Sequence, residues 1–247
     1  MIQGKLRGRR VLIENEADAS TLRNKGSTGR NLGEKLSLDL MTSLDLLTRK
    51  RIEIKKGENP ITIEQIERML SDTEKDIAAS YHFLKAKGMR PQIKKGKLYA
   101  DGTKILIFRD DQEIDFTVLT RNVNFLSILD SEGNCLLYTL NKLPIYGRSR
   151  GTSELVSDAQ EPTELVDVLM RKGMRVASGF KFGSRFRIYE GSSSHARYLM
   201  NVGKQSLGRD IVAIVRIAQS VRKTYVHSFY DVAKDQFKFF EIKWIRL

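Results

Sequence analysis

The chain has 247 residues, of which 40% are hydrophobic and 30% are charged, and its formal net charge is +13. This length and composition exclude a disordered chain, and they allow one large domain or two to three small domains with a real core. No apolar run reaches the roughly 18 to 20 residues that a membrane helix needs, and the N-terminus is unlike a signal peptide. We therefore expect a soluble, cytoplasmic protein that does not bind a membrane.

Cysteine and histidine are too few and too scattered for the common metal and disulfide patterns. The single Cys135 excludes an intrachain disulfide framework, and His82, His195 and His227 lie at spacings that match no zinc motif. We expect no metal and no cofactor.

The first part of the chain predicts a small mixed α/β unit, with a strand at 10–14 and a helix at about 17–23. A loop with Gly26, Gly29 and Gly33 follows, but these glycines do not have the spacing of a phosphate-binding loop.

Ser37 is predicted to cap the next helix, because apolar side chains then recur at intervals of three and four residues, at Leu40, Met41, Leu44 and Leu47. A short strand at 52–54 follows, and the Gly, Asn and Pro of residues 57–60 indicate a boundary.

Two similar blocks of a helix followed by strands make up the rest of the chain. The first begins with a helix or helix pair at 62–87 and continues with strands at 97–100, 104–108, 114–119, 124–129 and 135–140. The second begins at Glu164. Lys-Gly-Met-Arg occurs at 87–90 and again at 172–175, each time where a helix is expected to end at glycine. The sequence therefore predicts a duplicated α/β unit, with an exposed linker between the copies.

The positive charge lies almost entirely in the second copy. Residues 171–247 contain 16 Lys and Arg against 5 Asp and Glu, whereas the preceding 170 residues are nearly balanced at 27 against 25. Aromatic residues are interleaved with the cations, a mixture that holds phosphates and offers faces for unstacked bases. A solvated basic surface over an aromatic core is the alternative interpretation.

The two copies differ in residues that carry chemistry. When 102–108 is aligned with 183–189, Tyr189 takes the place of Phe108. The second copy then has His195 in a Gly-Ser loop, where the first copy has carboxylates that would repel a phosphate. Farther on, Arg216 and Lys223 lie seven residues apart on a predicted helix, so they project from nearly the same face, roughly 10.5 Å apart.

At these residues the chain resembles the archaeal tRNA-splicing endonucleases and their eukaryotic catalytic counterparts. The stretch 173–189 is similar to the strand pair that leads to the family's catalytic tyrosine, 195–199 to its catalytic histidine and the strand after it, and 221–223 to its catalytic lysine motif. Residues 10–54 are similar to the family's small N-terminal domain.

The resemblance implies an α/β (α+β) chain with a small N-terminal α/β domain at 1–60 and a degenerate, non-catalytic nuclease-like repeat at 61–145. A linker at 146–162 and a catalytic domain at 163–247 would follow, both repeats being restriction-endonuclease-like units.

The resemblance also implies the reaction, which is metal-independent cleavage of precursor tRNA at bulge-helix-bulge junctions. Tyr189 would be the general base, His195 the general acid and Lys223 the electrostatic stabiliser, giving a 2′,3′-cyclic phosphate and a 5′-hydroxyl. Arg216 and Trp244 would hold an unpaired base between their planar faces.

The resemblance further implies two kinds of contact residue. Lys181 and Arg222 would bind RNA. Asp130 and Glu132 would form an assembly loop that docks on a second chain, because excising an intron needs two cuts and one chain has one reactive copy.

Two other functions remain open at the level of the sequence. The chain could be a non-catalytic RNA-binding or assembly subunit of a splicing endonuclease, in which the basic copy supplies affinity alone. It could also be a metal-dependent nuclease of restriction-enzyme type, although that chemistry needs clustered carboxylates and the five acids of the basic copy are well separated.

Overall fold

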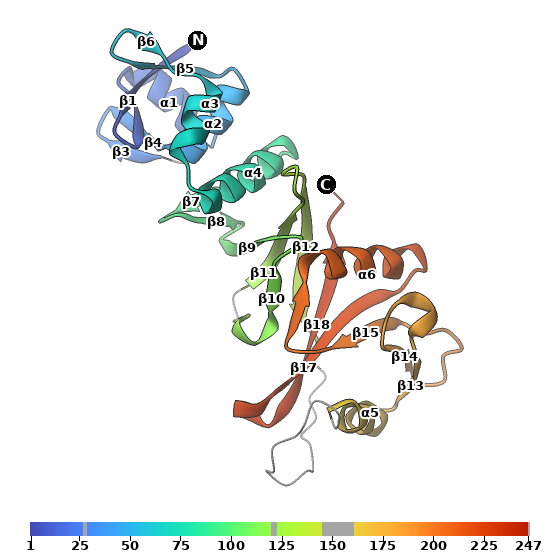
Figure 1. Cartoon of the computed structure of the whole chain (residues 1–247). Coiled ribbons are helices and arrows are strands. Elements are labelled where there is room, and N and C mark those ends of the chain that lie inside the picture. The colour runs from blue at the N-terminus through green and yellow to red at the C-terminus, as the bar shows by residue number, and fades with distance from the viewer. Residues whose placement is uncertain (27–28, 120–122, 145–160, 247) are drawn as a thin grey trace. The chain divides into compact units, whose positions relative to one another are not determined.

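The computed structural model describes residues 1–26, 29–119, 123–144 and 161–246 (Figure 1). The chain divides into two compact units. Unit 1 comprises residues 1–107 and 132–135, and unit 2 comprises residues 108–131 and 136–247. Among the described residues, no helix is both long and apolar enough to cross a membrane.

Unit 1 begins with a six-stranded sheet in the order β3-β4-β2-β1-β5-β6. Strands β1 and β5 are parallel and the other neighbours are antiparallel. Alternate strand residues such as Val11, Leu38 and Ile54 are buried, as expected for a sheet with one face on the core. The elements are β1 (Ile2–Arg7), β2 (Arg10–Ile13), α1 (Glu16–Asn24), β3 (Arg30–Leu32), β4 (Lys35–Asp39), α2 (Leu40–Thr48), β5 (Ile52–Lys56) and β6 (Asn59–Pro60).

The predicted cap of α2 was wrong. Ser37 lies inside strand β4, where it pairs with Leu12, and its hydroxyl accepts a hydrogen bond from Arg10 Nε at 2.7 Å. The N-cap is Asp39, whose carboxylate accepts from the backbone N–H of Thr42 at 2.8 Å. A strand can run directly up to the capping residue, so the first Ser before an apolar repeat is not always the cap.

Two capping boxes explain why the predicted helical segment is a pair of helices. Helix α3 (Ile63–Met69) starts at Thr62, helix α4 (Asp72–Ala86) starts at Ser71, and each hydroxyl is matched by a Gln or Glu three residues later. Three antiparallel strands follow in unit 1: β7 (Gln92–Lys94), β8 (Lys97–Ala100) and the first residues of β9 (Thr103–Arg109).

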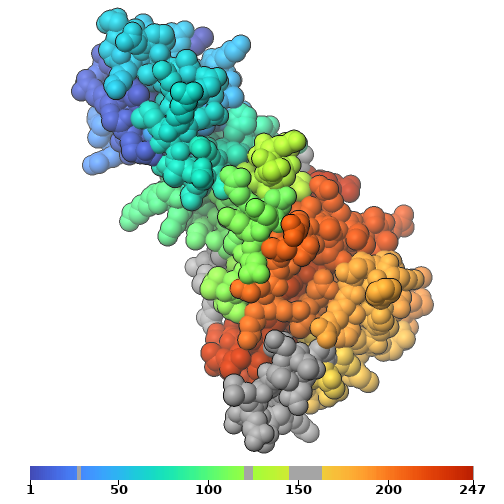
Figure 2. Space-filling view, viewed as in Figure 1, coloured from blue at the N-terminus to red at the C-terminus, as the bar shows by residue number. Residues whose placement is uncertain are grey.

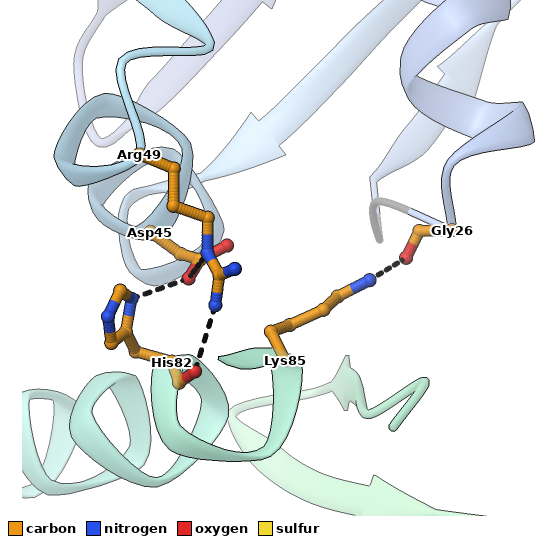
Figure 3. A network of polar contacts seen from close by, with 5 residues as sticks. All are labelled: Gly26, Asp45, Arg49, His82 and Lys85. Atoms are coloured by element: carbon orange, nitrogen blue, oxygen red, sulfur yellow. Dashed lines mark hydrogen bonds and ion pairs between the residues drawn. The ribbon is translucent and has the colours of Figure 1, made fainter. Parts of the chain in front are cut away.

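A polar network joins α2 to α4 (Figure 3). Asp45, a nearly buried carboxylate, accepts from Arg49 Nε and faces His82 Nδ1, each at 2.7 Å. Arg49 also donates to the carbonyl of His82, and Lys85 donates to the carbonyl of Gly26 at 2.8 Å. Burial lowers the pKa of Lys85. His82 therefore has a structural role in unit 1, because it contacts Asp45 and Arg49.

Unit 2 contains a sheet in which seven neighbouring strands follow the order β13-β14-β15-β17-β18-β12-β11. The elements that continue the chain are β10 (Glu113–Asp115), β11 (Val123–Leu129), β12 (Cys135–Lys142), α5 (Glu161–Arg171), β13 (Met174–Ser178), β14 (Phe186–Glu190), β15 (Tyr198–Val202), β16 (Gln205–Leu207), α6 (Gly208–Ser220), β17 (Thr224–Asp231) and β18 (Gln236–Trp244). The pairs β13–β14, β14–β15, β17–β18 and β18–β12 are antiparallel. Strands β15 and β17 are parallel and are joined through α6.

Each face of this sheet is covered by a helix (Figure 1). Helix α5 packs Leu165 and Leu169 into one cluster with Ile188, Tyr198 and other buried strand residues. The alternate strand residues, such as Leu199 and Tyr225, are also buried and belong to the opposite face, where α6 places its apolar side chains Ile211, Ile214, Val215 and Ala218. The α+β fold class is confirmed.

One predicted strand, 114–119, was only partly correct. Strand β10 ends at Asp115, whose carboxylate accepts from Thr117 N at 2.8 Å and turns the chain into a short 3₁₀ helix at Phe116–Val118. Such local side-chain bonds compete with strand formation. Phe116 thereby turns into the core and stacks on His227, with 3.8 Å between the ring centroids.

The two copies share their turn positions. Gly88 and Gly173, which follow α4 and α5, have φ angles of 79° and 75°, and Gly102 and Gly183, which precede β9 and β14, have φ angles of 76° and 68°. The described residues of the first copy contain no counterpart of α6. The division into four domains stays a prediction, and its linker lies mostly outside the described residues.

Candidate active site

The three predicted catalytic residues lie at one end of neighbouring strands. In the sheet Ile188 pairs with Tyr198, and Tyr198 pairs with Thr224. The next residues along this row are Tyr189, at the end of β14, and Lys223, immediately before β17. Arg187 lies near the rings of both Tyr189 and Phe182, and Lys223 Nζ lies near that of Phe182, so Tyr189 and Lys223 face one cluster of side chains.

The end of α6 fixes the position of Lys223. The backbone N–H of Lys223 donates to the carbonyl of Ala218 at 2.8 Å, and that of Arg222 donates to the carbonyl of Gln219 at 3.1 Å. Arg222 has a φ of 55°, in the left-handed region. This is the hydrogen-bond pattern of a Schellman helix end, with arginine at the position where glycine is favoured. The sharp turn brings Lys223 from the helix directly to the start of β17.

The start of α6 is anchored on the loop of the first copy. Gly208 N–H donates to the carbonyl of Gln112 at 2.9 Å, and Arg209 N–H donates to that of Asp110 at 2.7 Å. A side chain at position 208 would put its Cβ 2.6 Å from the carbonyl oxygen of Arg109. Glycine is therefore required for this close approach.

Cations and aromatic rings alternate around Tyr189. The Arg175 guanidinium lies 5.0 Å from the centre of the Tyr189 ring, and that of Arg187 lies 5.9 Å from it. Arg187 also lies over Phe182, at 6.0 Å, and Lys223 Nζ lies 5.9 Å from the same ring. This cluster, which we call the cationic cluster (Arg175, Arg187 and Lys223), places three positive groups where a phosphodiester could be bound. Figure 2 shows the corresponding segments, 174–190 and 205–225, side by side on the surface of unit 2.

His195 lies in the exposed loop between β14 and β15, and Arg175 holds that loop. Arg175 donates to the carbonyls of Gly191, at 3.4 Å, and Ser193, at 2.5 Å. Ser193 in turn bonds the backbone of His195, donating to its carbonyl at 3.0 Å. No hydrogen bond joins the imidazole of His195 to Tyr189 or Lys223 in the described structure. Arg175 therefore connects the ring of Tyr189 to the loop that carries His195.

Three other tyrosines of the region lie in environments that disfavour the phenolate form. Burial, aided by a 2.9 Å hydrogen bond to Glu190, raises the pKa of Tyr198 to about 12. Burial also raises the pKa of Tyr225, and a hydrogen bond to Asp235 raises that of Tyr230 to about 12. These three remain phenols at neutral pH.

Glu190 closes the end of the β14–β15 pair. It accepts from Arg197 at 2.5 Å as well as from Tyr198, and the hydrogen bond from Arg197 lowers the pKa of the Glu190 carboxyl. Glu190, the acid next to Tyr189 in the sequence, is thus hydrogen-bonded to Arg197 and Tyr198.

His227 is excluded as an acid by its burial. The ring is buried in the core and stacks on Phe116, with Nδ1 at 2.9 Å from the Tyr225 hydroxyl and Nε2 at 2.8 Å from the carbonyl of Gly203. Burial lowers the pKa of His227 to about 4, so the imidazole is neutral at physiological pH. Of the three histidines, His195 is the one in an exposed loop of unit 2.

The predicted RNA-binding residues are at the surface, with one exception. Arg216 on α6, Lys181 and Arg222 are exposed, whereas Trp244 at the end of β18 is half-buried and pairs with Tyr138. The guanidinium over the Trp244 ring is that of Arg246, at 5.1 Å. Among the described residues no cation–π contact joins Arg216 to Trp244.

The predicted assembly loop is the turn between β11 and β12. Asp130 is half-buried, Glu132 is exposed and accepts from Asn134 at 3.3 Å, and Gly133 has a φ of 81°. In the residues that the structure describes, no group of three His, Cys, Asp or Glu side chains could hold a metal ion.

Sequence reasoning missed Arg175, Arg187 and Phe182 as site residues. All three lie in the stretch 173–189, so the mixture of cations and aromatics was the available signal. The same stretch exposes Phe180 almost completely, at 89% of its surface.

Comparisons with known proteins match both ends of the chain. The family model described as tRNA intron endonuclease, N-terminal domain, matches residues 2–67, and that described as tRNA intron endonuclease, catalytic C-terminal domain, matches residues 164–239. The second match includes Tyr189, His195 and Lys223, and ends before Trp244.

Several curated proteins named tRNA-splicing endonuclease are similar to the chain. That of Thermoplasma volcanium is 26% identical over 239 residues, which cover 77% of this chain and 80% of that protein. That of Thermococcus gammatolerans is 31% identical over 144 residues, covering 53% and 83%. That of Methanopyrus kandleri is 35% identical over 85 residues, covering 32% and 48%.

Proposed function

The chain belongs to the tRNA intron endonuclease family, and on that premise we propose that it cuts precursor tRNA at bulge-helix-bulge junctions by metal-independent attack of a 2′-hydroxyl. The observation that supports the proposal is the cationic cluster: Arg187 lies near the rings of both Tyr189 and Phe182, Lys223 lies near the Phe182 ring, and Arg175 bonds the loop that carries His195. The matches to the two family models confirm the family resemblance, and the reaction details are our proposal.

Proton transfer in this reaction needs one base and one acid. Tyr189 takes the proton of the 2′-hydroxyl, and the 2′-oxygen attacks the adjacent phosphorus. The bond from phosphorus to the 5′-oxygen breaks, and His195 gives its proton to that oxygen. The products are a 2′,3′-cyclic phosphate and a 5′-hydroxyl, so no water is consumed in the step and the enzyme is a lyase.

Lys223 stabilises the negative charge that builds up on the phosphorane oxygens. Its support is its place in the cationic cluster, 5.9 Å from the Phe182 ring, because a fixed cation needs no reorganisation when the charge develops. Arg175 and Arg187 add positive charge on the Tyr189 side, which favours binding of the scissile phosphate between these side chains.

Recognition of the junction would use other side chains of the same unit. Arg216 and Trp244 would hold an unpaired base between them, which needs a gap between the two side chains rather than direct contact. Lys181 and Arg222 would contact the backbone beside it.

Assembly would follow from the number of sites. One chain carries one reactive copy and an intron needs two cuts, so we propose a homodimer in which the loop of Asp130 and Glu132 docks on a basic surface of the second chain. Reversing both charges, Asp130→Lys with Glu132→Lys, is expected to weaken dimerisation and cleavage together while the catalytic residues stay intact. A variant that dimerises and cuts normally in light scattering and cleavage assays would remove the loop from the interface.

Incubation with a bulge-helix-bulge precursor tRNA in excess chelator tests the function. Cleavage with cyclic phosphate ends supports the proposal. RNA binding without cleavage under any condition would indicate a non-catalytic subunit, and cleavage that starts only after magnesium is added would indicate the metal-dependent chemistry.

A further inference from the structure

Unit 1 contains a basic groove of about 880 Å³, separate in sequence from every residue assigned to cleavage. It lies between the loop and strands that follow α1 and the β7–β8 hairpin. Its lining carries five cations, Arg10, Arg23, Arg30, Lys94 and Lys95, and a single acid, Asp39. The lining therefore has a formal charge of +4 if Asp39 is ionised.

Asp39 does not neutralise the cations, because its carboxyl is turned toward the start of α2. It accepts from the backbone N–H of Thr42 at 2.8 Å and from the Thr42 hydroxyl at 3.2 Å. Burial raises the pKa of Asp39, against the attraction of the nearby Arg10 guanidinium, which lowers it. The groove is therefore positive despite this acid.

Two of the arginines are held in place by the unit itself. Arg10 donates to the hydroxyl and carbonyl oxygens of Ser37, at 2.7 and 3.2 Å. Arg23 donates to three successive carbonyls, those of residues 33–35, at 3.2 to 3.3 Å. Among the described residues no ion pair joins either arginine to a carboxylate, and both side chains lose little conformational freedom when an anion binds.

The lysines of the opposite wall lie on a tight hairpin. Lys94 pairs with Lys97, and the two residues between them, Lys95 and Gly96, have φ angles of 49° and 68°. Asparagine is the favoured residue at the first of these positions, and lysine adopts it at some cost. The turn presents three exposed lysines within four residues.

The lining points to phosphates rather than to bases or a small apolar ligand. It has no aromatic side chain on which an unstacked base could lie, unlike the cationic cluster of unit 2. Its apolar members are Leu36, Met41 and Ile93, fewer than the cations, whereas small-molecule pockets are lined mainly by apolar groups.

We propose that this groove binds the phosphate backbone of a double-stranded arm of the precursor tRNA, as a second contact besides the junction. The proposal rests on the function proposed above, since it takes its RNA from there. Contacts of this kind are independent of base sequence and act by releasing counterions, so they make binding dependent on salt.

The test removes three exposed cations of the groove without disturbing its fold. Arg30→Gln and Lys94→Gln neutralise surface groups, and Lys95→Asn replaces lysine by the residue best suited to the left-handed turn. The matched control removes the same charge from exposed positions of unit 1 that do not line the groove: Lys55→Gln, Lys56→Gln and Arg68→Gln.

Affinity for a whole precursor tRNA and for a short junction RNA is measured for both triple variants across a salt series. The groove variant is expected to bind the precursor about tenfold or more weakly than the control, with a salt slope smaller by about 2 to 3, and to lose less affinity for the short RNA. Equal affinities of the two variants for the precursor would overturn the groove proposal.

Cleavage by the wild type separates this outcome from failure of the proposed function. If the wild type cuts the precursor and the two variants bind it equally, the groove proposal fails and the function stands. If the wild type cuts no RNA but the groove variant still loses affinity, the groove binds RNA and the proposed function fails.

Discussion

Strands β9 and β14 are built alike, but they serve different purposes. Each follows a glycine in the left-handed region and reaches an aromatic residue, Phe108 in β9 and Tyr189 in β14. The turn after Phe108 supports the first residues of α6 through the carbonyls of Asp110 and Gln112. The turn after Tyr189 carries His195.

We interpret the two blocks as copies of one unit that divide its work, and this duplication stays a prediction. The first copy keeps its backbone geometry and uses its loop as a support for α6. The second copy keeps the same geometry and adds a phenol, an imidazole and, beyond α6, an ammonium group. We therefore expect the cleavage step to use side chains of the second copy alone. The positions of these side chains are expected to depend on both copies.

The largest effect is expected from removing one reactive group of the second copy. His195→Ala or Lys223→Ala should reduce the single-turnover cleavage rate by on the order of 10² or more and leave RNA affinity nearly unchanged, because each acts on the transition state. Rapid-quench cleavage and equilibrium RNA binding check this. Wild-type rates from either variant would remove that residue from the site.

The support from the first copy is tested by Gly208→Ala. A methyl group at this position meets the carbonyl oxygen of Arg109 at 2.6 Å, so α6 must shift or the variant must lose stability, by roughly 1 to 3 kcal/mol. Thermal unfolding followed by circular dichroism measures the loss. An unchanged melting temperature with unchanged cleavage would show that α6 does not depend on this contact.

A smaller effect is expected for Arg175, which joins Tyr189 to the His195 loop. Arg175→Met should slow cleavage about tenfold, a change of about 1.4 kcal/mol, by loosening the loop. Arg185→Met removes the same charge from the residue just before β14, whose side chain has no hydrogen bond to the loop among the described residues, and this variant should cleave faster than Arg175→Met. Equal rates for the two variants would assign the effect of Arg175 to its charge alone.

The smallest effect is expected at the end of α6. Arg222 occupies a left-handed position that favours glycine, so Arg222→Gly should leave the free energy of unfolding within about 0.5 kcal/mol of the wild type or raise it. The affinity for RNA should nevertheless fall, because the proposed contact of the Arg222 side chain with the RNA backbone is removed. A stability loss with unchanged affinity would make Arg222 a structural residue.

Some features of the fold could be predicted because they depend on local sequence. The paired Lys-Gly-Met-Arg turns and the helices of 62–87 follow from glycine and capping residues within a few positions. The capping of α2 by Asp39 and the bend at Phe116 could not be predicted in this way. The cap of α2 depends on strand β4, which pairs Ser37 and leaves Asp39 to cap the helix. The bend at Phe116 depends on the packing of this side chain against His227 in the core.

The candidate site shows the same limit. Tyr189, His195 and Lys223 were predicted from the contrast between the copies and from the family resemblance. Arg175 was not, because its role depends on cross-strand pairing with Tyr189 and on hydrogen bonds to a loop 16 to 18 residues away in the sequence. Whether these residues react stays a prediction.

The most direct test of the account is the single-turnover cleavage rate of Tyr189→Phe, which removes one hydroxyl group and makes the end of β14 resemble the end of β9. The ring contacts with Arg175 and Arg187 can remain, so RNA affinity and stability should change little. The account predicts a rate lower by on the order of 10² or more on a bulge-helix-bulge precursor in excess chelator. A rate close to that of the wild type would contradict it, because the base would then lie elsewhere.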